Sequence, residues 1–479
     1  MIIRGIDMDL LNTEFKRIFS FSPYKSMKLN LAQMNFCKDF VSDSRGDLYP
    51  ILHKSEDCAE AVGQNRYLLC GGEIKRLVCR FFPYATYELT ASIKQGAVGM
   101  SFILPEVEAT VLVGDRKVRF CCEGSEKEIA LPSFVTSRFT LIVSCRPGAF
   151  DIYFVQNGKP EYLCSFDEEK FNNSNLYSSF SCGKVALVAR GEIELESLLS
   201  YIDNGISIAD MRPIRYENGE IMVEGGKAYF TVSIRMQAGC FQGVLAWVPG
   251  TMELELCGAI FYDSGDGKWY GDVAASVLYH RTEKRWYLWV CSFAHDHILG
   301  HSCFEGDVRF GVNVVDLTLM QKAPEGAQIS EFLGFSGDED PDFFYDEKTN
   351  KWLMAICRLD PATRKYRYVF FESDSAFEGY EFIGAGYDGA ETGGSFVKVD
   401  GELYFVCGND FNKRANYRIY HKGGMTEAKF DYDDGGFRGW GTLMPVKLGS
   451  RTRYFWMTFD RHNGSNYTWS YGNIYCFEG

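Results

Sequence analysis

Three acidic residues stand at the head of separate apolar segments in the second half of the chain. They are Asp210 in Ala-Asp-Met-Arg-Pro, Asp340 in Glu-Asp-Pro-Asp and Glu391 in Glu-Thr-Gly-Gly. Cleavage of a glycosidic bond needs one carboxylic acid to protonate the leaving oxygen and one carboxylate to activate water or attack the sugar. Crowding of carboxylates in a concave site raises the pKa of at least one of them, which supplies the acid. These residues would suit that reaction if the fold brought them together.

The segments that carry them belong to a repeat that begins after residue 204. Each copy has a small or acidic lead, an apolar strand, a short polar turn, and a second strand rich in Tyr, Trp and Phe. The leads fall near residues 210, 272, 340, 391 and 440. Five copies at this spacing predict a five-bladed β-propeller. Because the inner strand of each blade begins beside the central pocket, the acidic leads are expected to converge there.

The chain before residue 205 has a different pattern. From about residue 66, apolar and polar residues alternate, and residues 111–120 and 151–163 are typical of β-hairpins, the second with Asn157-Gly158 at its tip. Many strands without intervening helices predict an antiparallel, jelly-roll-like β-sandwich over residues 66–204. Residues 1–65 are predicted to be an extension that packs on the sandwich. Its residues 9–19 have helical spacing and predict a short helix.

The amino-acid composition limits the classes of molecule that this protein is expected to bind. The 479 residues include 64 Asp and Glu against 50 Lys and Arg, and the net charge of −14 argues against nucleic acid or an anionic membrane as a partner. The 16 cysteines are scattered without a Cys-x-x-Cys pair, and no apolar core of signal-peptide length opens the chain. We therefore expect a cytoplasmic protein with buried thiols and without a cofactor or catalytic metal. A single structural calcium ion at the propeller axis is the one metal that this architecture suggests.

The acidic motifs resemble those of the five-bladed propeller glycosidases, namely glycoside hydrolase families 43 and 62 and the fructan-active families 32 and 68. Asp210 is similar to the Ala-Asp-Pro lead of family 43, Asp340 to the Arg-Asp-Pro motif of the fructan-active enzymes, and Glu391 to their Glu-Gly-Pro or Glu-Cys-Pro acid motif. The resemblance covers about residues 205–479, a catalytic propeller domain. The sandwich resembles the concanavalin-like lectin and glucanase domains in topology alone.

The motifs also depart from these families. Met211-Arg212 interrupts the usual Asp-Pro pair, Glu339 stands where the fructan-active enzymes have Arg, and Thr392-Gly393 replaces Gly-Pro or Cys-Pro. In blade one, Glu217 and Glu220 are rivals of Asp210 for the acidic role.

The resemblance implies a glycoside hydrolase that removes arabinofuranosyl, xylosyl or fructosyl units from plant-derived oligosaccharides. Glu391 would be the general acid, and Asp340 would hold the sugar and tune the pKa of Glu391. Asp210 would activate water in an inverting enzyme or attack the sugar in a retaining one. Inversion is favoured because the blade-one lead looks more like family 43.

Other lead residues are predicted to bind the substrate. Asp272 and Asp338 could accept sugar hydroxyls, and Arg212 could hold a substrate group or form a structural ion pair. Trp269 and Trp440 lie next to Gly at blade leads and are candidates for stacking on a sugar face.

Two other functions remain open. A propeller phosphorylase, as in family 130, would need a basic cluster, for which the candidates are Arg414, Arg418, His421 and Lys422. A non-catalytic carbohydrate-binding protein would be a propeller that has lost its acid.

Overall fold

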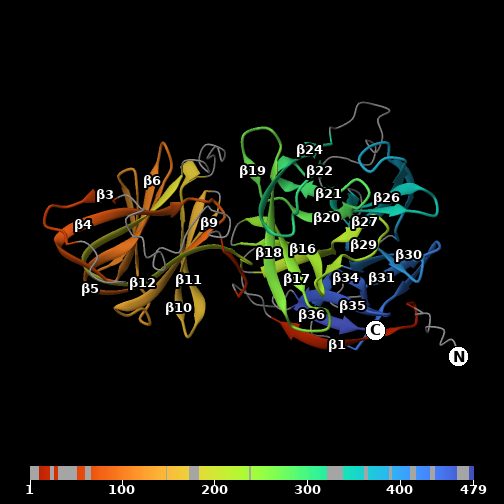
Figure 1. The fold of residues 1–479 in the computed structure, drawn as a ribbon, viewed down its shortest axis with the longest axis horizontal. Coiled ribbons are helices and arrows are strands. Elements are labelled where there is room, and N and C mark those ends of the chain that lie inside the picture. Colours follow the sequence, from red (N-terminus) through yellow and green to blue (C-terminus); the bar gives the residue numbers. More distant parts are fainter. Residues whose placement is uncertain are drawn as a thin grey trace. The chain divides into compact units, whose positions relative to one another are not determined.

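The computed structural model describes residues 10–21, 26–30, 51–59, 66–146, 148–171, 183–205, 207–236, 239–320, 338–360, 365–387, 391–409, 417–431, 437–460 and 474–479 (Figure 1). The chain divides into two compact units, Lys28–Asp203 and a second unit that joins the residues up to Met27 with Asn204–Gly479. Within the described residues, no helix is both long and apolar enough to cross a bilayer.

The first unit is an antiparallel sandwich built from one continuous sheet, with the order β11-β10-β9-β5-β12-β4-β3, β2 paired to β12, and β6, β7 and β8 added beside β5. Its elements are β2 (Lys28–Asn30), β3 (Ile51–Lys54), β4 (Arg66–Arg80), β5 (Thr86–Ile103), β6 (Glu108–Gly114), β7 (Lys117–Cys122), β8 (Ser125–Ala130), β9 (Arg138–Arg146), β10 (Ala149–Gln156), β11 (Lys159–Asp167), the short 3-10 helix η3 (Glu169–Phe171) and β12 (Lys184–Asp203).

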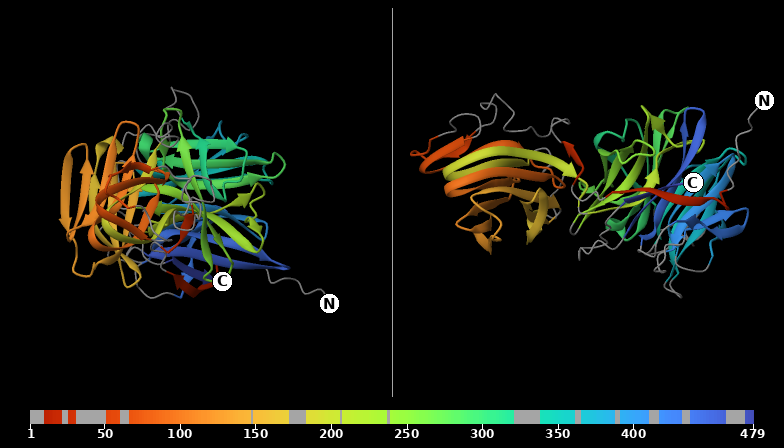
Figure 2. Two further views of the ribbon diagram at one scale, coloured as in Figure 1. Left: turned by 60° about the vertical axis from the view of Figure 1, so that its left-hand side comes forward. Right: turned by 90° about the horizontal axis from the view of Figure 1, so that it is seen from below.

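The long strands β5 and β12 let this one sheet form two layers. The first half of β5 pairs with β9 and its second half with β6. Between the halves, Gly96 has a φ of 98° and lies so close to the backbone of β12 that a Cβ would overlap the carbonyl of Arg190. The layer that contains β6 and β7 packs on the layer that contains β9 and β10 through aromatic side chains. The rings of Phe120 in β7 and Phe150 in β10, for example, lie 5.5 Å apart. Figure 2 shows the curvature of these strands in orange and yellow-green.

The second unit consists of five further sheets. Their strands, sheet by sheet, are β13 (Ser207–Pro213), β15 (Val223–Glu224), β16 (Lys227–Arg235), β17 (Cys240–Trp247), β18 (Leu254–Asp263), β19 (Trp269–Tyr270) and β23 (Gly311–Asp316); β14 (Arg215–Tyr216), β20 (Val273–His280), β21 (Arg285–Ser292), β22 (Ile298–Phe304) and β24 (Thr318–Leu319); β25 (Asp338–Asp346), β26 (Lys351–Asp360), β27 (Lys365–Ser373) and β28 (Glu381–Ala385); β29 (Glu391–Val399), β30 (Glu402–Asn409), β31 (Arg418–His421) and β32 (Gly424–Glu427); and β33 (Lys429–Phe430), β34 (Phe437–Leu448), β35 (Arg451–Asp460), β36 (Ile474–Glu478) and β1 (Glu14–Phe21). A 3-10 turn, η4 (Phe293–His295), follows β21.

These sheets form a propeller. Their first strands contact one another in a closed cycle, β13 to β20, β25, β29, β34 and back to β13. Four of the sheets use only strands after residue 206, and the remaining one also takes in β1 from the start of the chain. The prediction of an all-β protein with an N-terminal sandwich followed by a propeller is therefore confirmed.

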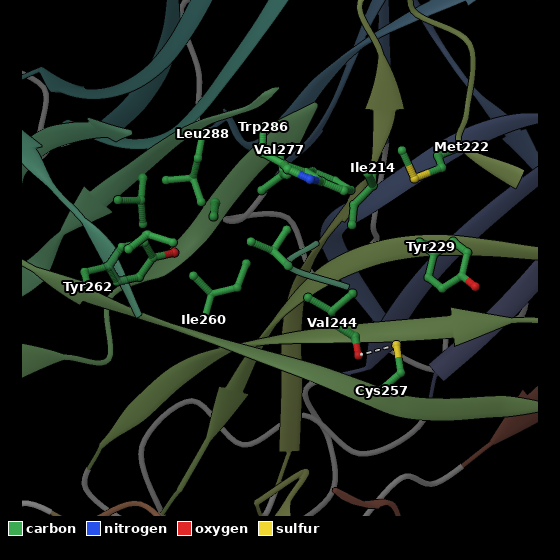
Figure 3. Close-up of a cluster of buried hydrophobic side chains, with 14 of the residues drawn as sticks. Ile214, Met222, Tyr229, Val244, Cys257, Ile260, Tyr262, Val277, Trp286 and Leu288 are labelled. Atoms are coloured by element: carbon green, nitrogen blue, oxygen red, sulfur yellow. Dashed lines mark hydrogen bonds between the residues drawn. The ribbon is translucent and has the colours of Figure 1, made fainter. Parts of the chain in front are cut away.

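Aromatic and aliphatic side chains fill the spaces between neighbouring sheets. Figure 3 shows one such cluster, in which Tyr229, Ile260 and Trp286 come from the first and second sheets. Trp352 and Phe455, from the second strands of later sheets, are likewise buried. These aromatic side chains of the second strands therefore belong to the core.

Each inner strand has an irregularity near its start, where the pairing with the next strand shifts. In β13, β20, β25 and β29 the residue at this point has a positive φ, and these residues are Asp210, Ala274, Asp340 and Gly393. A positive φ is uncommon outside glycine, although Asp tolerates it better than most residues. The irregularity turns two aspartates, one in β13 and one in β25, toward the same end of the propeller.

The predicted N-terminal helix is wrong. Residues 14–21 form β1, which pairs antiparallel with β36 and parallel with β33. This part of the predicted extension thus belongs to the propeller unit and not to the sandwich. Pairing with strands more than 400 residues away decides the conformation, because it buries Phe15 completely, whereas Ile18 stays exposed.

Replacing Phe15 by alanine should destabilise the propeller by about 3 kcal/mol, since a buried aromatic side chain is lost. Its ring lies 5.2 Å from that of Trp456 and 5.4 Å from that of Phe430. Differential scanning calorimetry of the full chain would show the loss as a lower unfolding temperature. Ile18→Ala, in the same strand but exposed, should change little; equal effects of the two variants would contradict the pairing of β1.

Candidate active site

A cavity of about 360 Å³ lies where the inner strands of the propeller begin. It is lined by residues from the first, second, third and fourth sheets and from the loop after β21, namely Asp210, Arg235, Cys240, Val273, Phe293, His297, Glu339, Asp340, Tyr366 and Thr392. Three carboxyl groups therefore face one enclosed space. Asp210 and Asp340, predicted from the sequence, are two of them.

Asp210 is held in place from the neighbouring strand. Its Oδ2 accepts hydrogen bonds from Ser233 Oγ at 2.5 Å and from Arg235 Nη2 at 3.3 Å. The side chain is 4% exposed and lies on the cavity wall. A hydroxyl donor and a guanidinium both stabilise a negative charge, which suits a carboxylate that acts as a base.

Asp340 is the second carboxyl group of the cavity. Its Oδ2 accepts hydrogen bonds from Thr392 Oγ1 at 2.9 Å and from the backbone N–H of Gly393 at 3.1 Å. Burial and the nearby charge of Asp210 raise the pKa of Asp340 to about 7, although Arg212 acts in the other direction. Asp340 is thus set to carry a proton up to near-neutral pH, next to a second carboxyl group.

Glu339 is the third carboxyl group of the cavity. It accepts a hydrogen bond from Tyr366 Oη at 3.0 Å, and its Oε1 lies 3.3 Å from His297 Nδ1. This contact raises the pKa of His297 above its usual value, against the effect of burial. The sequence comparison marked Glu339 only as a departure from an Arg-Asp-Pro motif.

Glu391 is not among the described residues that line the cavity, although its neighbour Thr392 is. The side chain of Glu391 is fully buried. Oε1 accepts hydrogen bonds from Arg418 Nη1 at 2.8 Å and from the hydroxyl of Tyr420, and Oε2 accepts one from the backbone N–H of Tyr368 at 3.1 Å. The packing leaves no room for a side chain at Gly386 next to Oε2. The structure therefore does not bring Glu391 together with Asp210 and Asp340.

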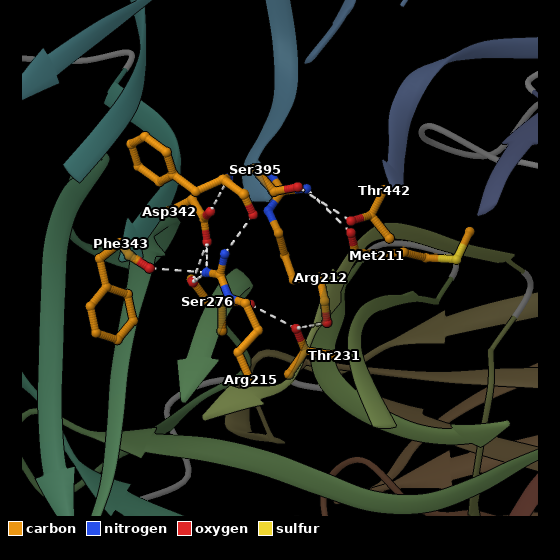
Figure 4. A network of polar contacts seen from close by, with 11 residues as sticks. Met211, Arg212, Arg215, Thr231, Ser276, Asp342, Phe343, Ser395 and Thr442 are labelled. Atoms are coloured by element: carbon orange, nitrogen blue, oxygen red, sulfur yellow. Dashed lines mark hydrogen bonds and ion pairs between the residues drawn. The ribbon is translucent and has the colours of Figure 1, made fainter. Parts of the chain in front are cut away.

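Arg212 lies in a buried polar network and not in the cavity (Figure 4). The residues that follow the irregularity in the five inner strands are Arg212, Ser276, Asp342, Ser395 and Thr442. Arg212 Nη1 donates to the carbonyl of Met211 at 3.3 Å, while Nε and Nη2 have no hydrogen-bond partner among the described residues. Its predicted contact with substrate has no support from this position.

The network does not fit the calcium ion considered from the sequence. Asp342, the one carboxylate among these five residues, is paired with Arg215 at 2.6 Å and accepts the backbone N–H of Phe396. Calcium takes six to eight oxygen ligands, and here two guanidinium groups occupy the same space. Among the described residues, no group of three or more His, Cys, Asp or Glu could hold a metal ion.

Asp272, Asp338 and Trp269, which were also predicted to bind substrate, are not among the described residues that line the cavity. Asp272 is buried and accepts hydrogen bonds from Ser292 Oγ at 2.6 Å and from the backbone N–H of Ala294 at 3.3 Å. Asp338 is buried, 3.9 Å from Arg358 Nε. Trp269 is buried in β19, and the side chain of Trp440 lies outside the described residues.

The two rivals of Asp210 point to other surroundings. Glu217 pairs with Arg281 at 2.9 Å, and Glu220 lines a separate cavity of about 560 Å³ formed by turns of the first, fourth and fifth sheets. Asp210 is therefore the blade-one carboxylate of the candidate site.

Sequence reasoning missed several lining residues. Arg235, Phe293 and Tyr366 lie far from the leads, in strand ends and loops that the repeat pattern does not mark. His297 belongs to a group of three histidines, with His295 and His301, within seven residues of the sequence. The one available signal was that this His-containing loop follows the second sheet on the side of the leads.

No protein-family model matches the sequence, and no curated protein matches it. Among solved structures, a GH43 β-1,3-galactosidase with galactodeoxynojirimycin is similar at 11% identity, with 56% of this chain and 94% of that chain covered and a TM-score of 0.38. The α-L-arabinofuranosidase PaAbf62A from Podospora anserina, in complex with cellotriose, is similar at 10% identity, with 57% and 91% covered and a TM-score of 0.38. The carbohydrate-binding module CBM66 from Bacillus subtilis is similar at 14% identity, with 32% and 94% covered and a TM-score of 0.25.

Proposed function

We propose that this protein is a glycoside hydrolase that removes terminal sugar units from oligosaccharides. The observation that carries the proposal is the pair Asp210 and Asp340, two carboxyl groups from separate sheets that line one cavity, where burial and the charge of Asp210 raise the pKa of Asp340. A carboxyl group with a raised pKa beside a second carboxyl group is typical of acid–base catalysis. Asp210 would be the base and Asp340 the proton donor.

In this mechanism Asp340 gives its proton to the glycosidic oxygen as the bond to the anomeric carbon breaks. Both hydrogen bonds to Asp340 end on Oδ2, so we assign the proton to Oδ1. Asp210 takes a proton from the attacking water, whose oxygen bonds to the anomeric carbon. In a retaining variant, Asp210 would attack the carbon itself. We keep inversion as the proposed outcome, and proton NMR of the first-formed anomer distinguishes the two.

The role proposed from the sequence for Glu391 passes to Asp340. A proton donor must lie within hydrogen-bond reach of the oxygen that it protonates. Glu391 is enclosed by Arg418, Tyr420 and the backbone of Tyr368, with no described contact to the cavity. We propose that Glu391 supports the wall of the site through these bonds.

The cavity suggests a small, neutral terminal unit. Its volume of about 360 Å³ lies near the lower end of the range for ligand sites, roughly 300–1,000 Å³. Asp210 and Glu339 would repel an anionic sugar. Arabinofuranosyl, xylosyl and fructosyl units, which the motif resemblance implies, meet both conditions and are the proposed substrates.

Hydrolysis is favoured over phosphorolysis because the candidate basic cluster is already paired. Arg418 binds Glu391 at 2.8 Å, Lys422 binds Glu402 at 2.9 Å, and His421 stacks on Tyr404. Arg414 lies outside the described residues. None of the three described cations lines the cavity.

The test is a pH profile on two kinds of substrate. With arabino-, xylo- or fructo-oligosaccharides, kcat/KM should fall as the pH rises through about 7, because Asp340 loses the proton that the leaving sugar needs. With p-nitrophenyl glycosides, whose leaving group needs little protonation, this loss should be much smaller. Asp340→Asn should reduce oligosaccharide hydrolysis strongly and p-nitrophenyl hydrolysis less.

The same pKa has a consequence for stability. Because the pKa of Asp340 in the folded chain lies above its ordinary value of 3.8, the folded state binds the additional proton between these two values. The contribution of this group to folding therefore declines as the pH rises toward about 7.

In the kinetic test, an identical pH dependence of kcat/KM for both kinds of substrate would contradict the role of Asp340. Inactivity on the whole panel, with and without phosphate, would favour the carbohydrate-binding protein.

A further inference from the structure

The loop after β21, residues 293–297, is held in place by hydrogen bonds and forms part of the cavity wall. Asp272 anchors its start by accepting the hydrogen bonds of Ser292 and of the backbone N–H of Ala294, and Ser292 also contacts His295 Nδ1 at 2.7 Å. Asp296 and His297 then have positive φ values of 56° and 60°. Strained backbone of this kind is retained where the surrounding contacts hold it, often at ligand sites. The result is that Phe293 and His297 both line the cavity.

The cavity residues differ in depth. Asp210 and Asp340 are each 4% exposed, so the carboxyl pair lies at the closed end. Phe293 is 38% exposed, and the side chain of His297 is 33% exposed, so both lie at the open end. Among the described lining residues, the loop of residues 293–297 thus offers the exposed surface nearest to the rest of a chain whose terminal sugar reaches the carboxyl pair.

The open end has the composition of a sugar-binding surface. An exposed aromatic ring offers an apolar face to the C–H groups of a sugar. The ring of Phe293 lies 4.8 Å from that of His297, which in turn contacts Glu339, itself bound by Tyr366. An apolar face flanked by a few fixed polar groups is typical of sites that orient a ligand.

We infer that the loop of residues 293–297 forms a subsite for the second sugar ring, the leaving group of the reaction. Phe293 is the stacking surface, and His297, held by Glu339, is the hydrogen-bond donor to a hydroxyl of that ring. The inference rests on the proposed function, because it takes the carboxyl pair as the place of cleavage. It specifies the substrate as a glycoside of another sugar, in preference to a glycoside of a small alcohol.

Calorimetric binding to the full chain tests the subsite. The background variant is Asp210→Asn, which should not turn over its ligands. The probes are arabinobiose, xylobiose and a fructose disaccharide, each compared with the methyl glycoside of the same terminal sugar. With Phe293→Ala, disaccharide affinity should fall about tenfold and methyl glycoside affinity by less than about twofold, since only the second ring loses its stacking surface. Phe293→Trp should keep the disaccharide affinity.

Phe310 supplies a matched control. It is a phenylalanine of the same propeller, 52% exposed, and it does not line the cavity. Phe310→Ala should leave both affinities unchanged. Equal disaccharide affinity in Phe293→Ala and Phe310→Ala, or equal losses for disaccharide and methyl glycoside, would overturn the subsite.

The outcomes separate the two proposals. If the wild type hydrolyses disaccharides and Phe293→Ala does so equally well, the subsite is wrong and the proposed function stands. If no substrate is hydrolysed but disaccharide binding depends on Phe293, the subsite stands and the hydrolase is wrong. Absence of binding to every probe would overturn the subsite together with the proposed substrates.

Discussion

Replacing Asp210 by asparagine is expected to reduce kcat/KM by about 10³-fold on oligosaccharides and on p-nitrophenyl glycosides alike. Asparagine has nearly the same shape and can still contact Ser233 and Arg235, but it cannot take a proton from water. Because activation of water is needed whatever the leaving group, both kinds of substrate should be affected equally. Steady-state kinetics on the two kinds of substrate measures this directly.

Glu217→Gln is the matched control. Glu217 lies in the turn after β14 and is a rival of Asp210 in the sequence, but it pairs with Arg281 and does not line the cavity. Its loss should leave kcat/KM within roughly twofold, because Glu217 is not among the residues that line the cavity and cannot reach the reacting atoms. A strong effect of Glu217→Gln combined with a weak effect of Asp210→Asn would reverse the assignment of the blade-one carboxylate.

Replacing Glu391 by alanine is expected to destabilise the propeller by about 3–5 kcal/mol. The change leaves the guanidinium of Arg418 in a largely buried place without its partner, and it removes the acceptor for Tyr420 and for the backbone of Tyr368. Loss of one partner of a buried ion pair is strongly destabilising for this reason. Calorimetry of the full chain would record a lower unfolding temperature.

Two further variants separate stability from catalysis at this position. In Glu391→Leu combined with Arg418→Met, no charge is left unpaired, so part of the stability should return. Glu391→Gln keeps the shape and should not discriminate between oligosaccharides and p-nitrophenyl glycosides, whereas Asp340→Asn should. The reverse pattern would make Glu391 the proton donor, as the sequence motif first suggested.

The positions of Asp210 and Asp340 could be predicted because a repeat fixes the register. Both occupy the positive-φ position of an inner strand, and this shared position brings them to one cavity. Glu391 looks equivalent in sequence but precedes the corresponding residue of its own strand, Gly393, by two positions. Where the irregularity falls within a lead is not visible in residue spacing, so residue spacing could not show that Glu391 lies outside the described lining of the cavity.

Other features depended on distant pairing. The segment around Phe15 has a helical pattern, yet it becomes a strand because β36 offers an edge to it. Trp269 seemed available to a sugar, but β19 pairs with β18 and buries it. Arg418 and Tyr420, which donate hydrogen bonds to Glu391, lie in β31, about 30 residues further along the chain. Local sequence patterns contain none of these contacts.

The pairing of β1 with β36 also has a consequence for the order in which the protein folds. The sandwich lies between β1 and all the other strands of the propeller along the chain. During synthesis, the sandwich can therefore complete its sheet while β1 has no partner, because β36 follows it by more than 400 residues. Contacts of such large sequence separation form late and slow the folding of a domain. The propeller should consequently close only when the ribosome has released the last strand, well after the sandwich has become stable.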